Sequence, residues 1–419
     1  MELQLALQME GFETLRDYQE AALNQMIERR AVLVIAGTGT GKSAIFVSYA
    51  LIAERLVVVI EPHLALEFDQ VRQLQERGIA AEFLNGTQNS GERAAVLEKV
   101  AAGTLRLLYL TPEMAQNRDV AEVLRKADIA GFAIDEAHCL IRQGPGFREE
   151  YLQLPDLIAG CRNRPVVAAF TATATPRTAQ EIVKCLGMHD AFEYRGGVTR
   201  DNIRLSVIEI GHSLGGRKDA AIIEQRKREE ICRLLDKYPE RKTIVYCNTV
   251  ARVKKLKKFL RKNGYNVELF HGKCDDKAGR LQRFASGEVN IMVATNAFGL
   301  GVNISDVRLV IHHSPSIGMD DYVQEVGRAG RNGKQAKAVL LWHAYDFTIN
   351  RGMIEKARLR LTGDERRVRL TALDVLQAYA VDTGHCRWRK IRKFFGESKG
   401  KRCENQCDNC RRTESVVRR

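Results

Sequence analysis

A glycine-rich loop between an apolar segment and a helix-like segment carries the clearest chemistry in the sequence. It runs Ala36-Gly-Thr-Gly-Thr-Gly-Lys-Ser43 and follows the β-branched run Val32 to Ile35. Backbone N–H groups of such a loop, and the positive end of the helix after it, bind phosphate oxygens. Lys42 would reach the β- and γ-phosphates, and Ser43 would hold Mg²⁺. The sequence therefore predicts ATP and Mg²⁺ as cofactors, with these loop residues in contact: Gly37, Thr38, Gly39, Thr40, Gly41, Lys42 and Ser43.

An acidic pair in the segment Ile134-Asp-Glu-Ala-His138 supports this interpretation. The apolar run before it is typical of a buried strand, so Asp135 falls at the carboxyl end of a strand, where open α/β sheets bind ligands. Asp135 could hold the metal ion through water, and Glu136 could polarise the attacking water. The alternative is an acidic pair in an ordinary loop. This alternative does not explain why the acidic pair occurs together with a phosphate-binding loop.

Four cysteines near the end of the chain have the spacing of a metal site. Cys386, Cys403, Cys407 and Cys410 form the pattern C-x16-C-x3-C-x2-C, and four thiolates suit tetrahedral Zn²⁺. We expect His385, beside Cys386, to stay outside this set of four ligands. Disulfides are not expected in a long intracellular enzyme. The other six cysteines are scattered in or beside apolar segments and are predicted to be small core residues: Cys139, Cys161, Cys185, Cys232, Cys247 and Cys274.

The elements that must position these residues alternate between β-like and helix-like patterns, which predicts parallel sheets covered by helices. Up to about Gly211 the clearest strands are Val32–Ile35, Leu56–Ile60, Leu105–Leu110, Phe132–Ile134 and Val166–Phe170. The segment Gly211 to Gly216 is a predicted break, followed by a charged helix. The alternation then restarts, without a second phosphate loop, at Thr243–Tyr246, Val267–Phe270, Ile291–Val293, Leu309–Ile311 and Ala338–Leu341.

Length and charge limit the class of protein. A chain of 419 residues is long enough for two or three domains at roughly 150 residues each. The net charge of +14 favours a polyanionic partner, because a basic surface releases the counterions of a phosphate backbone; a merely basic soluble protein is the alternative. The sequence lacks an apolar run of the roughly 18 to 20 residues that span a bilayer and a signal-peptide pattern. We expect an intracellular protein, cytoplasmic and nucleoid-associated in a bacterium or nuclear in a eukaryote.

Several motifs resemble those of superfamily 2 helicases, and more narrowly those of the RecQ family. The general motifs are Ala36–Ser43, Asp135–His138, Thr171–Thr173 and Gln324–Arg331, and the RecQ-like segments include Leu84–Gln88 and Tyr109–Glu113. The similarity covers about residues 5 to 411. It implies an α/β fold of two tandem RecA-like parallel-sheet domains followed by a small helical zinc-binding subdomain with four cysteine ligands. The expected boundaries are 1–208, 209–345 and 346–411, with 412–419 as a disordered basic tail.

The same resemblance implies roles for individual residues. Phe12, Arg16 and Gln19 match the segment that reads adenine in this family. Arg331 matches the arginine that stabilises charge on the γ-phosphate from the second lobe, with Arg328 and Gln324 in support. Second-lobe similarity also extends over Ile244–Asn248, His271–Gly272 and Ala294–Asn303. The expected DNA contacts are Thr111, Phe147, Arg148 and Thr295.

The cysteine module also resembles its RecQ counterpart, through Cys386-Arg387, Phe394–Glu397 and the segment Cys407–Cys410. The module is rich in cations that would form either a DNA surface or a solvated helix face. These cations are Arg387, Arg389, Lys390, Arg392 and Lys393.

Two departures from the RecQ pattern affect the expected mechanism. After the acidic box, RecQ proteins usually carry a tryptophan, a histidine and an aspartate that couple DNA binding to ATP hydrolysis. This chain has Gln143, Pro145 and Gly146 there, although Tyr151 is kept, and these residues supply neither the stacking area nor the hydrogen bonds. The sequence also ends nine residues after Cys410, so we expect no winged helix.

The sequence thus predicts an ATP-dependent 3′–5′ DNA helicase or translocase acting on single-stranded and tailed duplex DNA, in recombination or repair. One alternative is an RNA-directed helicase, against which the four-cysteine module and the upstream adenine segment argue. Another is a DNA-binding or annealing protein with a weakly coupled motor. Retention of Lys42, Asp135, Glu136 and Arg331 argues against that second alternative.

Overall fold

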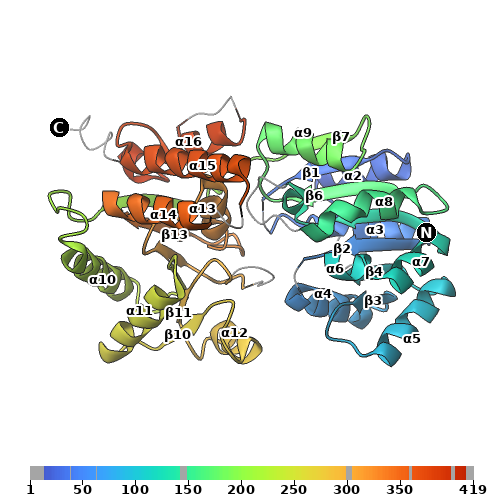
Figure 1. Ribbon diagram of the computed structural model, residues 1–419, viewed down its shortest axis with the longest axis horizontal. Helices are drawn as coiled ribbons and strands as arrows, with labels where there is room; N and C mark the ends of the chain where they lie inside the picture. The colour runs from blue at the N-terminus through green and yellow to red at the C-terminus, as the bar shows by residue number, and fades with distance from the viewer. Residues whose placement is uncertain are drawn as a thin grey trace. The chain divides into compact units, whose positions relative to one another are not determined.

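The computed structural model describes residues 14–37, 39–62, 64–141, 149–298, 304–357, 361–397 and 402–411. Contacts between residues divide the chain into two compact units, Met1–Gly197 and Val198–Arg419. Figure 1 shows the helices and strands of each unit.

The first unit is built on a seven-stranded sheet with the order β3-β4-β2-β5-β6-β1-β7. Its pairings are all parallel. The central strands are buried from end to end, which explains their continuous apolar sequences. The strands are β1 (Val32–Ile35), β2 (Leu56–Ile60), β3 (Ala81–Leu84), β4 (Leu107–Leu110), β5 (Ile129–Ile134), β6 (Val166–Thr171) and β7 (Phe192–Arg195).

Helices and two hydrophobic clusters complete the first unit. Along β1, Leu33 belongs to one cluster and Val34 to the other, as expected when successive side chains point to opposite faces of a sheet. Both faces are therefore buried. The helices are α2 (Asp17–Ile27), α3 (Ser43–Ala53), α4 (Leu64–Glu76), α5 (Ser90–Ala101), α6 (Pro112–Ala115), α7 (Arg118–Lys126), α8 (Leu154–Ala159) and α9 (Pro176–Cys185), with short 3-10 helices η1 (Ala137–Leu140) and η2 (Glu149–Gln153).

The second unit repeats this arrangement in a six-stranded parallel sheet with the order β10-β11-β9-β12-β13-β8. Position by position, this order matches β3-β4-β2-β5-β6-β1 of the first sheet, which adds β7 at its edge. The strands are β8 (Ile203–Glu209), β9 (Thr243–Tyr246), β10 (Val267–Phe270), β11 (Ile291–Ala294), β12 (Leu309–His312) and β13 (Ala336–Trp342).

The C-terminal helices share the core of the second unit. Leu340 of β13, Leu373 and Trp388 all belong to one buried cluster. In addition, α13 and α14 both pack against α15. The helices of this unit are α10 (Ala220–Lys237), α11 (Val250–Lys262), α12 (Lys277–Ser286), α13 (Met319–Val326), α14 (Ala344–Lys356), α15 (Gly363–Val381) and α16 (Arg387–Phe394).

The predicted fold class is confirmed, and every predicted strand segment overlaps a strand of the structure, although β4 begins at Leu107 and the predicted segment at Leu105. The two units divide between Gly197 and Val198, whereas the sequence placed residues 1–208 in the first lobe. Strand β8 causes this difference, because it pairs with β13 of the second sheet. A separate subdomain at 346–411 stays a prediction. Among the described helices, none has the length and apolar character needed to cross a membrane.

Candidate nucleotide site and metal centre

The glycine-rich loop lies between β1 and α3 and has the backbone conformation of a phosphate cradle. Gly39 and Gly41 have φ values of 76° and 86°, which favour glycine. A Cβ atom on Gly41 would lie 2.8 Å from Nε2 of Gln19, so a larger residue there would displace that side chain. Lys42 Nζ donates hydrogen bonds to the carbonyl oxygens of Ala36 (2.9 Å) and Gly37 (3.3 Å). The carbonyl oxygens of the loop therefore hold the ammonium group of Lys42 against the loop backbone. Thr38 lies outside the described residues.

Helix α2 braces this loop through two adjacent side chains. Gln19 Nε2 donates to the carbonyl oxygen of Gly41 (2.6 Å), and its Oε1 accepts from the backbone N–H of Arg16 (2.8 Å). The hydroxyl of Tyr18 donates to the carbonyl oxygen of Thr40 (2.9 Å). Sequence reasoning identified Gln19 but missed Tyr18, whose only signal was its place beside Gln19. Phe12, the third predicted adenine contact, lies outside the described residues.

Asp135 follows β5 at the carboxyl edge of the first sheet, as predicted. Its backbone N–H donates to the carbonyl oxygen of Ile60 (3.0 Å), and its Oδ1 accepts from the N–H of Glu136 (2.8 Å). Burial, together with the charge of Glu136, raises the pKa of Asp135 to about 6, while the charge of Lys42 acts in the opposite direction. A divalent cation would likewise favour the carboxylate. An acidic oxygen beside a phosphate loop is the donor that Mg²⁺ prefers.

Glu136 connects the acidic pair, through His138, to the end of β6. Its φ of 46° places the backbone in the left-handed region, and its Oε2 lies 3.2 Å from Nδ1 of His138. The same ring nitrogen lies 3.0 Å from the hydroxyl oxygen of Thr171. Burial lowers the pKa of His138, but Cys139 and Glu136 outweigh it and raise the pKa well above its ordinary value. The acidic motif and the motif Thr171–Thr173 thus form one bonded unit.

Tyr151, on η2, anchors the backbone beneath the acidic pair. Its hydroxyl donates to the carbonyl oxygen of Asp135 (3.2 Å), and its side chain is completely buried. The preceding residues that sequence reasoning singled out lie outside the described part of the chain. These residues are Gln143, Pro145, Gly146, Phe147 and Arg148.

In the second unit, the predicted phosphate-contacting residues lie on α13 and on the turn after it. Gln324 is on the helix, and Arg328 and Arg331 follow it. Gly330 has a φ of 57°, and a Cβ atom there would lie 2.5 Å from Nδ2 of Asn202. Its carbonyl oxygen accepts hydrogen bonds from Arg200 Nη2 (2.9 Å) and Asn202 Nδ2 (2.7 Å). The turn that carries Arg331 is therefore fixed to the segment preceding β8.

A buried acid on the same helix, missed by sequence reasoning, ties α13 to the sheet. Glu325 Oε2 lies 2.9 Å from Nε2 of His312 and accepts a hydrogen bond from the hydroxyl of Ser316 (2.5 Å). The His312 ring lies against Tyr246 and Tyr322, with centroid distances of 5.5 and 4.9 Å. The only sequence signal was an acidic residue next to Gln324.

Thr111 and Thr295 occupy equivalent positions in the two sheets. Each follows its strand and donates its backbone N–H across to the neighbouring strand, Thr111 to Leu84 O (3.4 Å) and Thr295 to Phe270 O (3.1 Å). The Thr111 hydroxyl caps α6 by accepting from Met114 N (3.3 Å). Both threonines are buried, so each is held firmly at the end of its strand.

The four C-terminal cysteines converge on one point. Their sulfur atoms all lie within 4.8 Å of one another. Backbone N–H groups donate to two of them: Cys403 N to Cys386 Sγ (3.3 Å), and Arg387 N and Cys410 N to Cys407 Sγ (3.4 and 3.5 Å). Hydrogen bonds from the thiols of Cys403 and Cys407 hold the pKa of Cys386 below its usual range. Four close sulfurs with N–H donors fit a tetrahedral Zn²⁺ site.

This cluster is attached to β8 through a buried ion pair. Arg387 Nε donates to Asp408 Oδ1 (3.0 Å), and Asp408 Oδ2 accepts from the backbone N–H of Val207 (3.0 Å). The indole N–H of Trp388 donates to the carbonyl oxygen of Ile203 (3.2 Å). Arg387 was predicted on a basic surface; that prediction is wrong, because the side chain is only 1% exposed. His385 bonds instead to Asp382 (2.9 Å).

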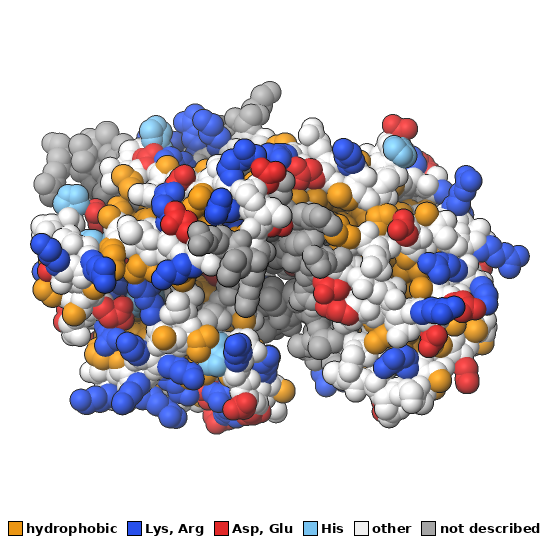
Figure 2. Space-filling view, in the orientation of Figure 1, with side chains coloured by type: hydrophobic (Ala, Val, Ile, Leu, Met, Phe, Trp, Pro, Cys, Tyr) orange, Lys and Arg blue, Asp and Glu red, His pale blue; other side chains and the backbone are white. Residues whose placement is uncertain are grey.

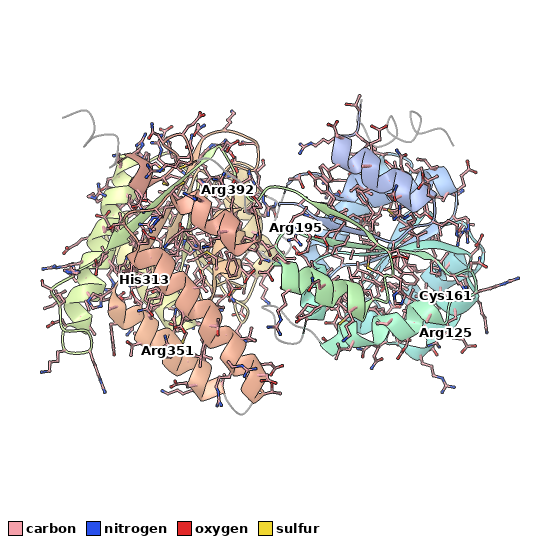
Figure 3. The ribbon with its side chains drawn as sticks, turned by 90° about the horizontal axis from the view of Figure 1, so that it is seen from above. Arg125, Cys161, Arg195, His313, Arg351 and Arg392 are labelled. Carbon is pink, nitrogen blue, oxygen red and sulfur yellow. The ribbon has the colours of Figure 1, made fainter. Side chains whose placement is uncertain are left out.

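The remaining cysteines are not all core residues, as the sequence had suggested. Cys139, Cys161 and Cys247 are buried, but Cys185 is exposed. Burial raises the pKa of Cys161 to about 11, so it is an inert thiol in the first unit, where Figure 3 labels it beside Arg125.

Positive charge is concentrated on α11. Seven of its thirteen residues are lysine or arginine, and none is acidic. Val253, Leu256 and Leu260 face the core, and five of the seven cations are exposed: Lys254, Lys255, Lys258, Arg261 and Lys262. Figure 2 shows lysine and arginine side chains gathered over this part of the second unit.

Family models match three consecutive stretches of the chain. Residues 16–182 match the DEAD/DEAH box helicase family, residues 226–333 the helicase conserved C-terminal domain, and residues 344–411 the RecQ zinc-binding family. Two parallel-sheet units with a phosphate loop and an acidic pair therefore define a two-domain helicase. The helicase models imply ATP and Mg²⁺, and the zinc-binding model together with the cysteine cluster indicates Zn²⁺.

Curated relatives narrow this class to one family. The ATP-dependent DNA helicase RecQ of Synechocystis is 32% identical over 338 residues, which cover 79% of this chain and 68% of that protein. RecQ of Pasteurella multocida is 33% identical over 403 residues, covering 96% of this chain and 60% of the relative. The chain belongs to the RecQ family of ATP-dependent DNA helicases. It spans less than two thirds of the length of the Pasteurella protein.

A solved structure agrees in fold. Yeast Dbp5, solved with RNA and ADP BeF3, superimposes with a TM-score of 0.65 at 17% identity, covering 99% of this chain and 96% of that one. At this identity the likeness concerns the fold alone.

Proposed function

We propose that this protein hydrolyses ATP and uses the energy to move 3′ to 5′ along single-stranded DNA and to unwind tailed duplexes. The observation that carries the proposal is the set of groups at the carboxyl edge of the first sheet, in a chain of the RecQ family. Gln19 bonds to the phosphate loop at Gly41, and the charge of Lys42 in this loop acts on Asp135 of the acidic pair.

Within the proposed site, each residue has a defined role. The loop N–H groups and Lys42 would bind the phosphates, and Ser43 and Asp135 would hold Mg²⁺, which would supply positive charge to the phosphates. Glu136 orients the attacking water and takes its proton; the contact of its Oε2 with His138 (3.2 Å) supports this orientation. Phe12, Arg16 and Gln19 read the adenine.

We assign the second half of the reaction to Gln324, Arg328 and Arg331 of the other unit. Hydrogen bonds from Arg200 and Asn202 to Gly330 hold the turn that carries Arg331, and so limit its movement. An arginine supplied to the γ-phosphate contributes about 10³ to 10⁵ in rate, and we assign this role to Arg331.

The proposed DNA contacts are Thr111, Phe147, Arg148 and Thr295. The equivalent positions of Thr111 and Thr295 support this assignment, because each follows a strand at the carboxyl edge of its sheet, where parallel sheets bind ligands. We assign Zn²⁺ to Cys386, Cys403, Cys407 and Cys410 in a structural role, since four thiolates complete a tetrahedral set of ligands and leave no position for a substrate.

The test compares ATP hydrolysis with single-stranded DNA, RNA of the same sequence, and 3′-tailed, 5′-tailed and blunt duplexes. We expect single-stranded DNA to stimulate hydrolysis more than RNA, and displacement on the 3′-tailed duplex. Stronger stimulation by RNA, or displacement only with the 5′-tailed duplex, would overturn the proposal.

A further inference from the structure

Two like charges lie side by side on the second sheet. Lys337 of β13 is in register with Arg204 of β8, so both side chains point to the same face. Each is partly buried, and each is near the amino end of its strand. Directly opposed like charges destabilise a sheet, and so this pair needs a compensating group.

Further cations surround the pair. The guanidinium of Arg241 lies 4.3 Å from the centre of the Tyr238 ring, and the Nζ atoms of Lys237 and Lys337 each lie 5.9 Å from it. The pKa of Lys337 is lowered by burial and then by the charges of Lys237, Arg204 and Arg233. Burial and the charge of Arg411 lower the pKa of Arg204.

Among the described residues, the two nearby acids, Glu230 and Asp236, are each bonded to another group. Glu230 attracts Lys337, but its carboxylate accepts two hydrogen bonds from Arg233 (2.7 and 2.5 Å). Asp236 accepts from the hydroxyl of Tyr265 (2.5 Å). The buried Nε of Arg204 has no hydrogen-bond partner among the described residues. Because Arg204 and Lys337 are each partly exposed, a guanidinium and an ammonium group are available to a ligand in one place.

We propose that Arg204, Lys337, Arg241 and Lys237, grouped around Tyr238, bind a phosphate group. Phosphate oxygens would accept from the guanidinium of Arg204 and the ammonium of Lys337 and neutralise the cross-strand repulsion. The site is distinct from the nucleotide site, because it lies at the amino ends of β8 and β13, whereas Asp135, Thr111 and Thr295 follow the carboxyl ends of their strands. The phosphate could belong to a nucleic-acid backbone or to a free phosphorylated compound.

The experiment measures thermal unfolding with added inorganic phosphate, against potassium chloride at equal ionic strength. Both tryptophans, Trp342 and Trp388, lie in the second unit, so their fluorescence reports on the unit that contains the site. All proteins carry Lys42→Ala, which weakens phosphate binding at the loop. The double variant Arg204→Gln/Lys337→Gln is compared with Arg118→Gln/Lys184→Gln, which removes two exposed charges from the first unit.

We expect phosphate to raise the Tm of the Lys42→Ala parent and of the control by roughly 2–4 °C. The site variant should lose this rise and unfold at an equal or higher temperature without phosphate, because the like charges are gone. A phosphate-dependent rise that persists in the site variant, or that is missing from the parent, would overturn the proposal.

A second measurement distinguishes the two sources of phosphate. If the ligand is a nucleic-acid backbone, the slope of log K for DNA against log salt should fall by about one unit in the site variant relative to the control. An unchanged slope with loss of the phosphate effect assigns the site to a free phosphorylated ligand. When Arg204→Gln/Lys337→Gln is made in the protein that retains Lys42, ATP hydrolysis without DNA should be unchanged. The phosphate-dependent change in Tm needs no ATP hydrolysis, so its failure is distinguishable from a failure of the proposed helicase activity.

Discussion

The two units share a strand order but differ in the segments that come after equivalent strands. In the first unit, β1 leads into the phosphate loop and β5 into Asp135 and Glu136. In the second, the equivalent strands β8 and β12 lead into Ile210 and His313. The same scaffold thus carries a candidate catalytic edge in one unit and a buried polar network in the other.

The network in the second unit uses its charges for packing. Lys227 Nζ lies 2.6 Å from Asp346 Oδ2, and both side chains are almost fully buried. His313 Nε2 lies 3.3 Å from Glu224 Oε1, and Arg252 donates to the hydroxyl of Ser314 (3.0 Å); Figure 3 labels His313 within this unit. Charges that are paired in the interior are not available to a ligand, whereas Lys42 bonds to loop carbonyls that phosphate would replace.

The largest expected effect is on chemistry at Lys42. Lys42→Ala should lower ATP turnover by roughly 10²–10³-fold or more, because it removes a charge aimed at the transferring phosphate. DNA binding should change little. Steady-state ATPase and filter-binding assays measure the two quantities, and an unchanged turnover would show that the nucleotide site is assigned to the wrong edge.

Loss of a metal ligand should come next. Cys407→Ser should abolish stoichiometric zinc binding and destabilise the second unit, because structural zinc contributes directly to folding. The matched control is Cys161→Ser, a buried thiol of the first unit that lies outside the cluster. Zinc content by metal analysis and unfolding by tryptophan fluorescence provide the readouts. A stable, metal-free Cys407 variant would contradict a structural role for the metal.

A buried lysine of the second unit should affect stability rather than chemistry. Lys227→Ala should lower the free energy of unfolding by about 3–5 kcal/mol, because it leaves the Asp346 carboxylate buried without its partner. The ATPase rate per folded molecule should remain within a few-fold of the parent, unlike that of Lys42→Ala. Urea unfolding tests the first expectation; a loss of turnover in a fully folded Lys227 variant would show that the network serves catalysis.

The smallest expected effect is a pH dependence of the same network. Burial opposes ionisation of Glu224, but its contact with His313 and the charges of Arg228 and Arg252 prevail and lower its pKa to about 2. Burial lowers the pKa of His313. The unfolded chain therefore binds more protons at both groups. The free energy of unfolding should therefore fall as the pH drops below about 6.5. The contribution of Glu224 to it is lost between about pH 4.5 and pH 2, and the two groups together should account for roughly 1–3 kcal/mol.

Urea unfolding followed by tryptophan fluorescence between pH 7 and pH 3 measures this dependence. Glu224→Gln should flatten the acid part of the curve, while Glu181→Gln, at an exposed ion pair of the first unit, should not. A wild-type stability that is constant from pH 7 to pH 3 would contradict the account.

The sequence predicted those features that local patterns specify. Continuous apolar runs identified the buried strands, and the loop at Ala36–Ser43, Asp135 and the four cysteines were recognisable because their chemistry requires fixed residue types at short spacing. The sequence of β8 did not show to which of the two sheets this strand belongs. Its residues alternate between buried and half-buried positions, and such a strand could lie at the edge of either sheet. Only pairing with β13 assigns it to the second unit.

Contacts between distant residues were beyond sequence reasoning. Arg387 looked like one more cation of a basic helix, yet it pairs with Asp408, 21 positions later. Lys227 and Asp346 are 119 positions apart, and nothing in either segment indicates the other. Such pairs depend on how whole elements pack, which a single sequence does not state.

The central claim is that ATP bound in the first unit drives strand separation on DNA. Its most direct test is displacement of the short strand from a 3′-tailed duplex, with ATP and Mg²⁺, by the parent protein and by Lys42→Ala. The account predicts displacement by the parent, none by the variant, and none without ATP. Equal displacement by both proteins, or displacement that is independent of ATP, would contradict it.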